Sequence, residues 1–145
     1  SKLEVRGMLR EVTEIESIGD SCYNLARTIN RKRSGGNDFT EKQYEHIHQM
    51  MQLTDDALAH MIAIVEDDHH VVDVNKSFNI ENEINNYRAQ LKNQNVVDVN
   101  NKEYDYQMGV HYMDLIGECE KLGDYVVNVV EARTNVKEKK TGDNR

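Results

Sequence analysis

The chain carries one sequence pattern twice, 104 residues apart. Residues 14–28 read EIESIGDSCYNLART, and residues 118–132 read ECEKLGDYVVNVVEA. Two glutamates, a glycine, an aspartate and an asparagine keep their register in the pairs Glu14/Glu118, Glu16/Glu120, Gly19/Gly123, Asp20/Asp124 and Asn24/Asn128. An internal repeat constrains the architecture before any other feature, because equal segments form equal structural units. We therefore expect two equivalent helices, near the two ends of the chain, related by a pseudo-twofold axis.

The composition favours long helices. The 145 residues include no proline, although proteins contain about 5% of this residue on average, and proline is the residue that breaks a helix interior. Apolar residues make up 38% and charged residues 30% of the chain, a balance typical of amphipathic helices with wide solvated faces. A chain of this length forms one domain with a sizeable core. The predicted fold class is all-α, with residues 1–145 as a single domain.

Four stretches have the three- and four-residue apolar spacing of helices, at about residues 2–33, 40–67, 70–94 and 101–139. The positions expected to face inward are Val5, Met8, Val12, Ile15, Cys22, Leu25 and Ile29 in the first stretch, Tyr44, Ile47, Met51, Leu58, Met61, Ile62 and Val65 in the second, Phe78, Ile84, Tyr87 and Leu91 in the third, and Tyr104, Met108, Tyr112, Leu115, Cys119, Leu122, Val126 and Val129 in the fourth. Short connections favour an antiparallel up-down bundle of these four helices. The charged tail, about residues 135–145, is expected to fray or be disordered.

The charge balance excludes some partners. The chain has 26 acidic and 18 basic residues, a net charge of −8, which repels a phosphate backbone, so no nucleic-acid partner is expected. No apolar run approaches the about 20 residues of a membrane span, so this chain is not expected to insert into a membrane. Cys22 and Cys119 lie on apolar stripes and are expected to be buried free thiols in a reducing compartment. Because the chain opens at Ser1 within a helical pattern, we expect it to be a piece of a longer protein.

The repeated acids point away from the main apolar stripes. At about 100° per residue, the rows that begin at Glu16 and at Glu120 both follow polar helix faces. Carboxylates at positions i and i+4 stand about 6 Å apart, a separation that a hard cation bridges, and oxygen ligands suit iron, manganese, magnesium, calcium or zinc. The candidate metal ligands are Glu16, Asp20, Glu120 and Asp124, with Asn24, Asn128 and Glu131 in support. The alternative is an ordinary solvated helix face.

No catalytic arrangement is visible in the sequence. It has no Ser/His/Asp or Cys/His nucleophile pattern, no Gly-rich phosphate loop and no cysteine zinc motif, so an enzyme is not expected. The six histidines form no spaced ligand set. Glu45 and His48, and likewise Glu66 and His69, imitate the E-x-x-H unit of di-iron bundles. These two units are roughly 30 Å apart along what should be one helix, so they cannot share a site.

The two copies of the repeat resemble the signature helix of PhoU-like domains, E-[RK]-[IL]-G-D-x-x-x-N-[IV]-x-E. The second copy, CEKLGDYVVNVVEA, keeps Glu120, Lys121, Leu122, Gly123, Asp124, Asn128 and Glu131. The first copy, ESIGDSCYNLA, keeps Glu16, Ile18, Gly19, Asp20 and Asn24, and departs at Ser17, where a basic residue is usual, and at Arg27, where an acid is usual. The stretch NIENEINNYRAQL and the run YMDL at 112–115 are similar to the PhoU-like tail of sodium/phosphate cotransporter II-related membrane proteins.

The resemblance implies a fold and a role. PhoU proteins are built from two three-helix repeats and regulate phosphate uptake, and some members hold multinuclear iron or zinc clusters on E(D)-x-x-x-D pairs. By this resemblance the chain is the last helix of a first repeat, followed by a complete second repeat. The third helix matches the other acid pairs of the family poorly, because Asn79 and Asn82 lie among its acids. A complete metal cluster is therefore not expected, and iron or zinc would bind weakly.

The function expected from the resemblance is regulatory. The leading interpretation is a non-enzymatic domain of a sodium-dependent phosphate transporter, at the cytoplasmic face of the inner membrane, whose partner is the membrane-embedded part of the same chain. Two alternatives stay open: a carboxylate-rich bundle that binds or stores iron or zinc, and a free-standing PhoU-type regulator of phosphate signalling. The sequence also leaves open whether the domain forms a homodimer.

Overall fold

The computed structural model describes residues 1–34, 38–67 and 72–142, with residues 31–34 and 135–142 described by their backbone alone. It contains four helices, α1 (Lys2–Ser34), α2 (Glu41–Val65), α3 (Asn75–Asn100) and α4 (Tyr106–Gly142). None of the described residues forms a strand. The all-α prediction is therefore confirmed.

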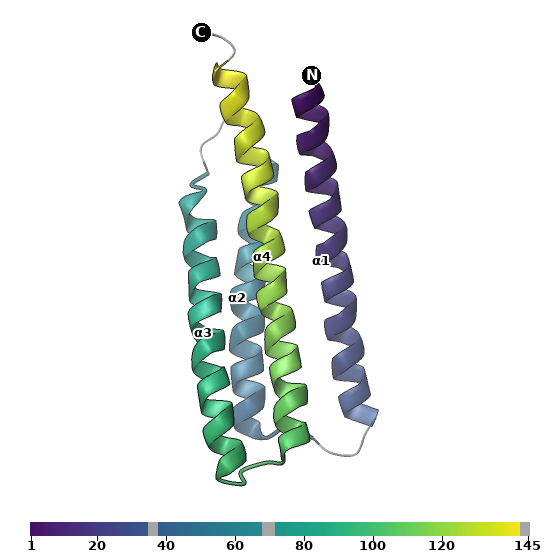
Figure 1. Ribbon diagram of the computed structural model, residues 1–145, viewed down its shortest axis with the longest axis vertical. Helices are drawn as coiled ribbons and strands as arrows, with labels where there is room; N and C mark the ends of the chain where they lie inside the picture. Colours follow the sequence, from purple (N-terminus) through teal and green to yellow (C-terminus); the bar gives the residue numbers. More distant parts are fainter. Residues whose placement is uncertain (35–37, 68–71, 143–145) are drawn as a thin grey trace.

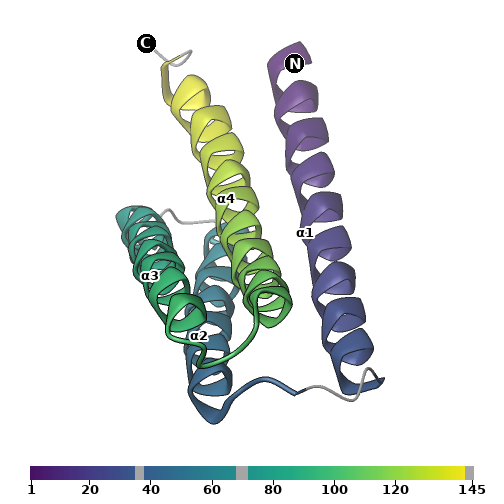
Figure 2. The same cartoon turned by 60° about the horizontal axis from the view of Figure 1, so that its bottom comes forward.

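The helices alternate in direction along the chain. α1 and α3 run one way, and α2 and α4 run the other way (Figure 1). α2, α3 and α4 pack against one another as a three-helix bundle, whereas α1 lies beside α4 (Figure 2). Within the described part of the chain, α4 is the one helix that α1 contacts. The up-down arrangement of four helices is thus present, with α1 attached along one side of a three-helix core.

Local sequence signals explain where α2 and α4 begin. Thr40 caps α2: its hydroxyl accepts the backbone N–H of Gln43 at 3.1 Å, and the Gln43 side chain accepts the backbone N–H of Thr40 at 2.9 Å. This capping box satisfies two backbone donors that a helix start leaves without partners. The Asp105 carboxylate accepts the backbone N–H of Met108 at 2.7 Å where α4 begins. α4 continues to Gly142, into the charged segment where the sequence predicts fraying.

α3 extends beyond its predicted end near residue 94 and continues to Asn100. Tertiary contacts hold this extra turn and a half. The Tyr104 hydroxyl donates to Asn95 Oδ1 at 2.7 Å. Gly109 lies so close to the same segment that an added Cβ would be 2.9 Å from Val99. Because these partners come from later in the chain, the local sequence could not indicate them.

The core lies between α2, α3 and α4. α4 supplies most of its fully buried side chains, and α2 and α3 contribute one large side chain each. The largest fully buried residues are Met50, Ile84, Leu115, Ile116, Cys119, Leu122, Val126, Val129 and Val130. The predicted stripe of the fourth helix is buried from Met108 to Val129, and Tyr104 is half-buried. In α2, the predicted burial of Tyr44 and Ile62 is wrong, since they are 42% and 50% exposed.

The predicted buried stripe of the first helix is mostly wrong. Val5, Met8, Val12 and Ile15 are between 45% and 63% exposed, and Cys22 is exposed as well. Leu25 is buried and Ile29 half-buried, as predicted. The residues of α1 that do pack against the rest of the protein include Ile18, Ser21 and Leu25. The physical reason is that a single neighbouring helix covers only a narrow strip of α1.

Candidate functional site

The acids of the second repeat copy lie on α4 between α3 and α1. We call Glu120, Asp124, Asn128 and Glu131 the acid row. On the α3 side, Arg88 Nε is 3.3 Å from Glu120. On the α1 side, Arg10 is 3.4 Å from Glu131, and Asn128 donates to Glu14 at 3.3 Å. The row is therefore half enclosed by its neighbours, with Asp124 as its exposed member.

Glu81 of α3 joins this row, although the sequence analysis did not select it. Burial raises the pKa of the Glu81 carboxyl, and so do a side-chain hydrogen bond with Asp124 and the negative charges of Asp124, Glu131 and Glu120. Two carboxyl groups that share one site disfavour a second ionisation. The signal that could have found Glu81 is its place in the acidic stretch NIENE of the third helix.

The first copy of the repeat has a different environment. Glu16, Asp20 and Asn24 are exposed on α1. The predicted exposure of the two equivalent aspartates is thus observed for both Asp20 and Asp124. In the second copy, α3 packs on α4 and supplies Glu81 and Arg88. In the described part of the chain, no such helix packs beside the acids of the first copy. The two E-x-x-x-D pairs are equal in sequence and unequal in surroundings.

The described residues do not form a complete metal centre. No group of three or more His, Cys, Asp or Glu side chains among them is placed to hold a metal ion. Glu120 is already paired with Arg88, a cation that competes with a metal for the same carboxylate. The multinuclear cluster known in some PhoU proteins therefore does not fit these residues. Cation binding at Glu16, Asp20, Glu120 and Asp124, supported by Asn24, Asn128 and Glu131, stays a prediction.

The earliest matched pair of the repeat, Glu14 and Glu118, joins α1 to α4. Glu118 accepts a hydrogen bond from the buried Ser21 hydroxyl at 2.6 Å, and Glu14 accepts the one from Asn128. Each copy of the glutamate thus reaches the helix that carries the other copy. The two contacts are not equivalent, because the repeat matches Asn128 with Asn24 and not with Ser21, so the pseudo-twofold axis stays a prediction.

The two cysteines differ in their environment. Cys119 is buried, and burial raises the pKa of its thiol to about 11. Cys22 is exposed, so the prediction that both thiols are buried is right for Cys119 and wrong for Cys22. Both are free thiols, as predicted.

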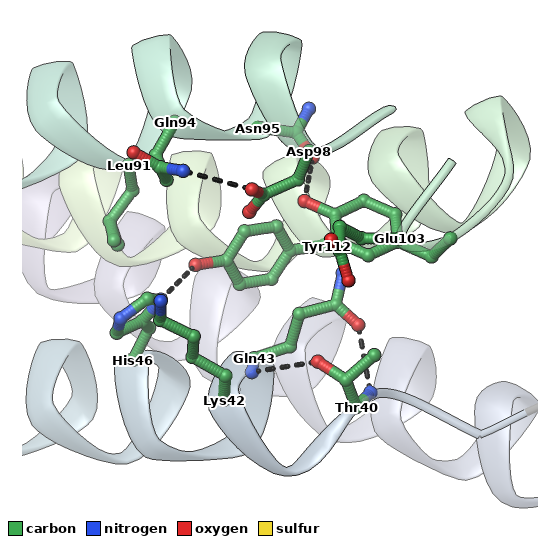
Figure 3. Close-up of a pocket in the computed structure, with 11 residues that line it drawn as sticks. Thr40, Lys42, Gln43, His46, Leu91, Gln94, Asn95, Asp98, Glu103 and Tyr112 are labelled. Atoms are coloured by element: carbon green, nitrogen blue, oxygen red, sulfur yellow. Dashed lines mark hydrogen bonds between the residues drawn. The ribbon is translucent and has the colours of Figure 1, made fainter. Parts of the chain in front are cut away.

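A polar cavity of about 270 Å³ lies where α2 begins and α3 ends. Its lining residues are Thr40, Lys42, Gln43, His46, Leu91, Gln94, Asn95, Asp98, Glu103, Tyr104 and Tyr112, most of which are drawn and labelled in Figure 3. Ten of these eleven side chains are polar, so the cavity suits water or a small polar molecule better than an apolar one. The sequence analysis did not predict this cavity, because its walls come from three helices and a loop.

A hydrogen-bonded pair crosses this cavity. The Tyr112 hydroxyl is 3.0 Å from His46 Nδ1 (Figure 3). Burial raises the pKa of Tyr112, and burial together with Lys42 lowers the pKa of His46. The phenol is therefore protonated and the imidazole neutral, so the hydroxyl donates to Nδ1 and the imidazole proton is on Nε2. The buried side chain of Gln43 lines the same cavity and forms a side-chain hydrogen bond with Tyr104.

A comparison with known families identifies the domain. The family model of the PhoU domain matches residues 47–132, more than half of the chain. The chain belongs to the PhoU family. No curated protein and no solved structure gives a significant match. The matched region of the PhoU domain covers most of α2, all of α3 and α4 up to Ala132, so it contains the acid row and Glu81 but leaves out α1.

Family membership confirms the predicted resemblance to PhoU-like domains and gives the domain its general role. PhoU domains regulate phosphate homeostasis, and the family is regulatory rather than enzymatic. No helix among the described residues is both long and apolar enough to cross a membrane.

Proposed function

We propose that this PhoU domain is the regulatory domain of a sodium-dependent phosphate transporter. It acts at the cytoplasmic face of the inner membrane, through contact with the membrane-embedded part of its own chain, and it catalyses no reaction. The support comes from the PhoU match together with the transporter-like stretches NIENEINNYRAQL and YMDL. Both stretches lie inside the three-helix bundle, on α3 and α4.

The observation that carries this proposal is the acid row with Glu81. The domain has a net charge of −8, and the row adds the exposed carboxylate of Asp124 to the open side of α4. Cytoplasmic loops of membrane proteins carry an excess of Lys and Arg. An acidic helix face is therefore complementary to the cytoplasmic side of a transporter, and such contact weakens as salt screens the charges.

The test uses binding and transport together. Purified domain is mixed with vesicles that contain the membrane-embedded part of the transporter, and with vesicles that lack it. We expect binding to the first kind only, with weaker binding at high ionic strength. In cells that produce the full-length transporter, the Asp124→Lys substitution should abolish the change in sodium-dependent phosphate uptake between phosphate-rich and phosphate-poor medium.

The repeat supplies a matched control for this test. Asp20→Lys makes the same charge reversal at the equivalent exposed position of the first copy, away from Glu81. We expect uptake regulation to survive this change. Equal binding to both kinds of vesicle would contradict the proposal. Binding to a transporter encoded by a separate gene, with no membrane-spanning segments in this protein's own gene, would favour the free-standing PhoU-type regulator instead.

A second candidate function is weak cation binding at the second copy of the repeat. The observation that favours it is the side-chain hydrogen bond between Glu81 and Asp124, which brings carboxyl groups of two helices together. Two carboxylates are an incomplete ligand set for iron or zinc, so the remaining ligands would be water or a partner's side chains. Elemental analysis of the purified untagged protein tests this function. A protein that stores a metal or uses it in redox chemistry must contain stoichiometric metal, so a metal-free protein would contradict such a role.

A further inference from the structure

The polar cavity around Tyr112 takes no part in the function proposed above. Its walls come from the start of α2, the end of α3, the connection between α3 and α4, and α4 itself, and α1 contributes none of them. The cavity therefore does not depend on what lies beside α1. Its volume of about 270 Å³ is sufficient for a small organic molecule as well as for water.

Charged side chains of both signs line the cavity. Asp98 and Glu103 contribute carboxylates, and Lys42 contributes the one ammonium group among the lining residues. Asp98 is half-buried, whereas Lys42 and Glu103 are exposed. The inner part of the cavity is therefore negative, because the charge that lies deepest in it is the Asp98 carboxylate.

The Asp98 carboxylate lies near the tyrosine rings of the cavity. Burial and then the negative charge of Asp98 raise the pKa of Tyr104. Burial, the neighbouring Tyr104 and Tyr87, and the charge of Asp98 raise the pKa of Tyr112. Figure 3 shows the Asp98 carboxylate directed towards the Tyr112 ring. A cation in the cavity would therefore interact with a carboxylate and with the faces of aromatic rings, both of which attract positive charge.

The tyrosine hydroxyls of the cavity donate their protons to partners within the protein. Tyr104 donates to Asn95 Oδ1 at 2.7 Å, and Tyr112 donates to His46 Nδ1 at 3.0 Å. Each phenol oxygen is left with lone pairs, which accept hydrogen bonds. Acceptors beside a negative charge suit a ligand that brings its own N–H donors and a positive charge.

The end of α3 brings both carboxylates to the cavity. Gln94 donates to Asp98 Oδ1 at 2.8 Å, which holds this carboxylate in place and leaves Oδ2 for another donor. Lys102 has a φ of 59°, in the left-handed region where glycine is the usual residue. The backbone N–H of Glu103 then donates to the Asp98 carbonyl at 2.9 Å. This turn folds the chain back, so Glu103 lines the same cavity as Asp98.

Other occupants fit these walls less well. An inorganic anion such as phosphate would lie beside Asp98 and Glu103, where like charges repel. A metal ion would need several side-chain ligands, and the described residues contain no group of three or more His, Cys, Asp or Glu placed to hold one. A wholly apolar molecule would leave the polar walls without partners, since Leu91 is the one apolar residue among them.

We propose that this cavity is a binding site for a small primary ammonium ion, such as a short protonated alkylamine. Asp98 and Glu103 bind the ammonium group, and the Tyr112 oxygen accepts one of its N–H groups. Leu91, which is 4% exposed, packs against the alkyl chain. None of these contacts involves the acid row or phosphate transport, so the site can be tested independently of the proposed function.

The first test is a titration of the nitrogen-15-labelled protein, followed by two-dimensional NMR at neutral pH and constant ionic strength in a buffer without amines. Butylammonium chloride is the probe, and 1-butanol is the uncharged control of similar size. We expect saturable shifts of the cavity residues, with butylammonium bound at least about 10-fold more tightly than 1-butanol. Equal affinity for the two, or a cavity that holds water alone and shows no saturable shift, would overturn the proposal. Tighter binding of inorganic phosphate or of potassium than of butylammonium would overturn it as well.

The second test removes one carboxylate at a time. Asp98→Asn keeps the shape of the side chain and the acceptor for Gln94, so the fold should be retained, and butylammonium binding should weaken at least about 10-fold. Glu103→Gln, at an exposed position, repeats the test without changing a half-buried group and should weaken binding several-fold. Asp114→Asn makes the same change as Asp98→Asn at an exposed position outside the cavity and is the matched control. Unchanged affinity in both cavity variants would overturn the proposal.

The third test checks the sign of the ligand's charge. Lys42 carries a positive charge that repels an ammonium ion in the cavity, so Lys42→Ala should strengthen butylammonium binding about 2-fold. Lys76→Ala, at an exposed position of α3 outside the cavity, is the control and should leave the affinity unchanged. Weaker binding in Lys42→Ala would show that the site attracts negative charge, and would overturn the proposal.

Discussion

Ser21 donates a hydrogen bond of 2.6 Å to Glu118, and this bond joins the first copy of the repeat to the second. Ser21 is 2% exposed, and the Glu118 side chain is 14% exposed. A hydrogen bond to a carboxylate in such a place is stronger than one between neutral groups, because little water competes for it. Among the described helices α1 contacts α4, and this bond is one of the interactions that hold it there, together with the contacts of Arg10 with Glu131 and of Glu14 with Asn128.

Ser21→Ala should therefore destabilise the protein by about 1–2 kcal/mol, because it removes the Ser21 donor and leaves the Glu118 carboxylate with the 3.7 Å ion pair to Lys121. Urea denaturation followed by circular dichroism measures the change. Ser17→Ala is the matched control: the Ser17 hydroxyl donates to the carbonyl of Thr13 in its own helix, so its loss should change stability by less than about 0.5 kcal/mol. Equal effects of the two substitutions would show that the bond to Glu118 contributes nothing specific.

The two glycines of the repeat should respond differently to the same change. Gly19→Ala should stabilise the protein by about 0.5–1 kcal/mol, since alanine favours a helix interior and the added Cβ meets no atom within 4 Å. Gly123→Ala should gain less or nothing, because its Cβ would lie 3.3 Å from the fully buried Ile84. The measurement is urea denaturation of each variant beside the wild-type protein. A larger gain at Gly123 would contradict the packing argument.

Asp124→Asn should change stability by no more than roughly 0.5 kcal/mol, and in the favourable direction, since it removes a charge that repels Glu81. It should also weaken the binding of Fe²⁺, Mn²⁺ or Zn²⁺, because an amide oxygen is a poorer ligand than a carboxylate. Thermal denaturation and metal titration check the two effects, with Asp20→Asn as the control in the first copy. A loss of several kcal/mol with unchanged metal affinity would identify Asp124 as a structural residue.

Acidification should destabilise the protein through His46. The pKa of His46 is lower in the folded protein than its usual value of 6.5, first through burial and then through Lys42. Below pH 6.5 the unfolded chain therefore binds more protons than the folded one, and the free energy of unfolding falls as pH decreases towards the folded pKa. Urea denaturation over this range should show the decline, and His46→Gln should flatten it. His48→Gln, at an exposed position of the same helix, should not.

Cys119 should resist alkylation in the folded protein. Its thiol is buried and its pKa is raised to about 11, so the reactive thiolate is scarce and shielded. In a Cys22→Ser variant, which leaves Cys119 as the remaining thiol, iodoacetamide should react only after denaturant is added. Mass spectrometry of the native and unfolded protein counts the labels. Rapid labelling of the native variant would show that Cys119 is not buried in the core beside Thr54 of α2.

Much of the fold was predictable from the sequence. The absence of proline and the apolar spacing predicted four helices, and the structure contains four in the part of the chain that it describes. The stripe from Met108 to Val129 is buried as predicted. The exposed positions of Asp20 and Asp124 also followed from their place opposite the apolar stripes. These predictions are right because they depend on residues within one helix.

Other features required the packed structure. The sequence could not indicate that Glu81 would join Asp124, since the two residues belong to different helices and come together only when α3 packs on α4. The cavity around Tyr112 likewise needs three helices and a loop. The end of α3 at Asn100 depends on partners that come later in the chain.

The first helix separates the two kinds of information most clearly. By itself, the sequence determined that α1 is a helix, that its acids share one face, and that Val5, Met8, Val12 and Ile15 share another, because helical periodicity fixes which residues lie together. Whether that apolar face is buried is a different matter. Burial requires a neighbour, and only the tertiary structure showed that α4, the one helix that α1 contacts among the described residues, packs on another side of α1.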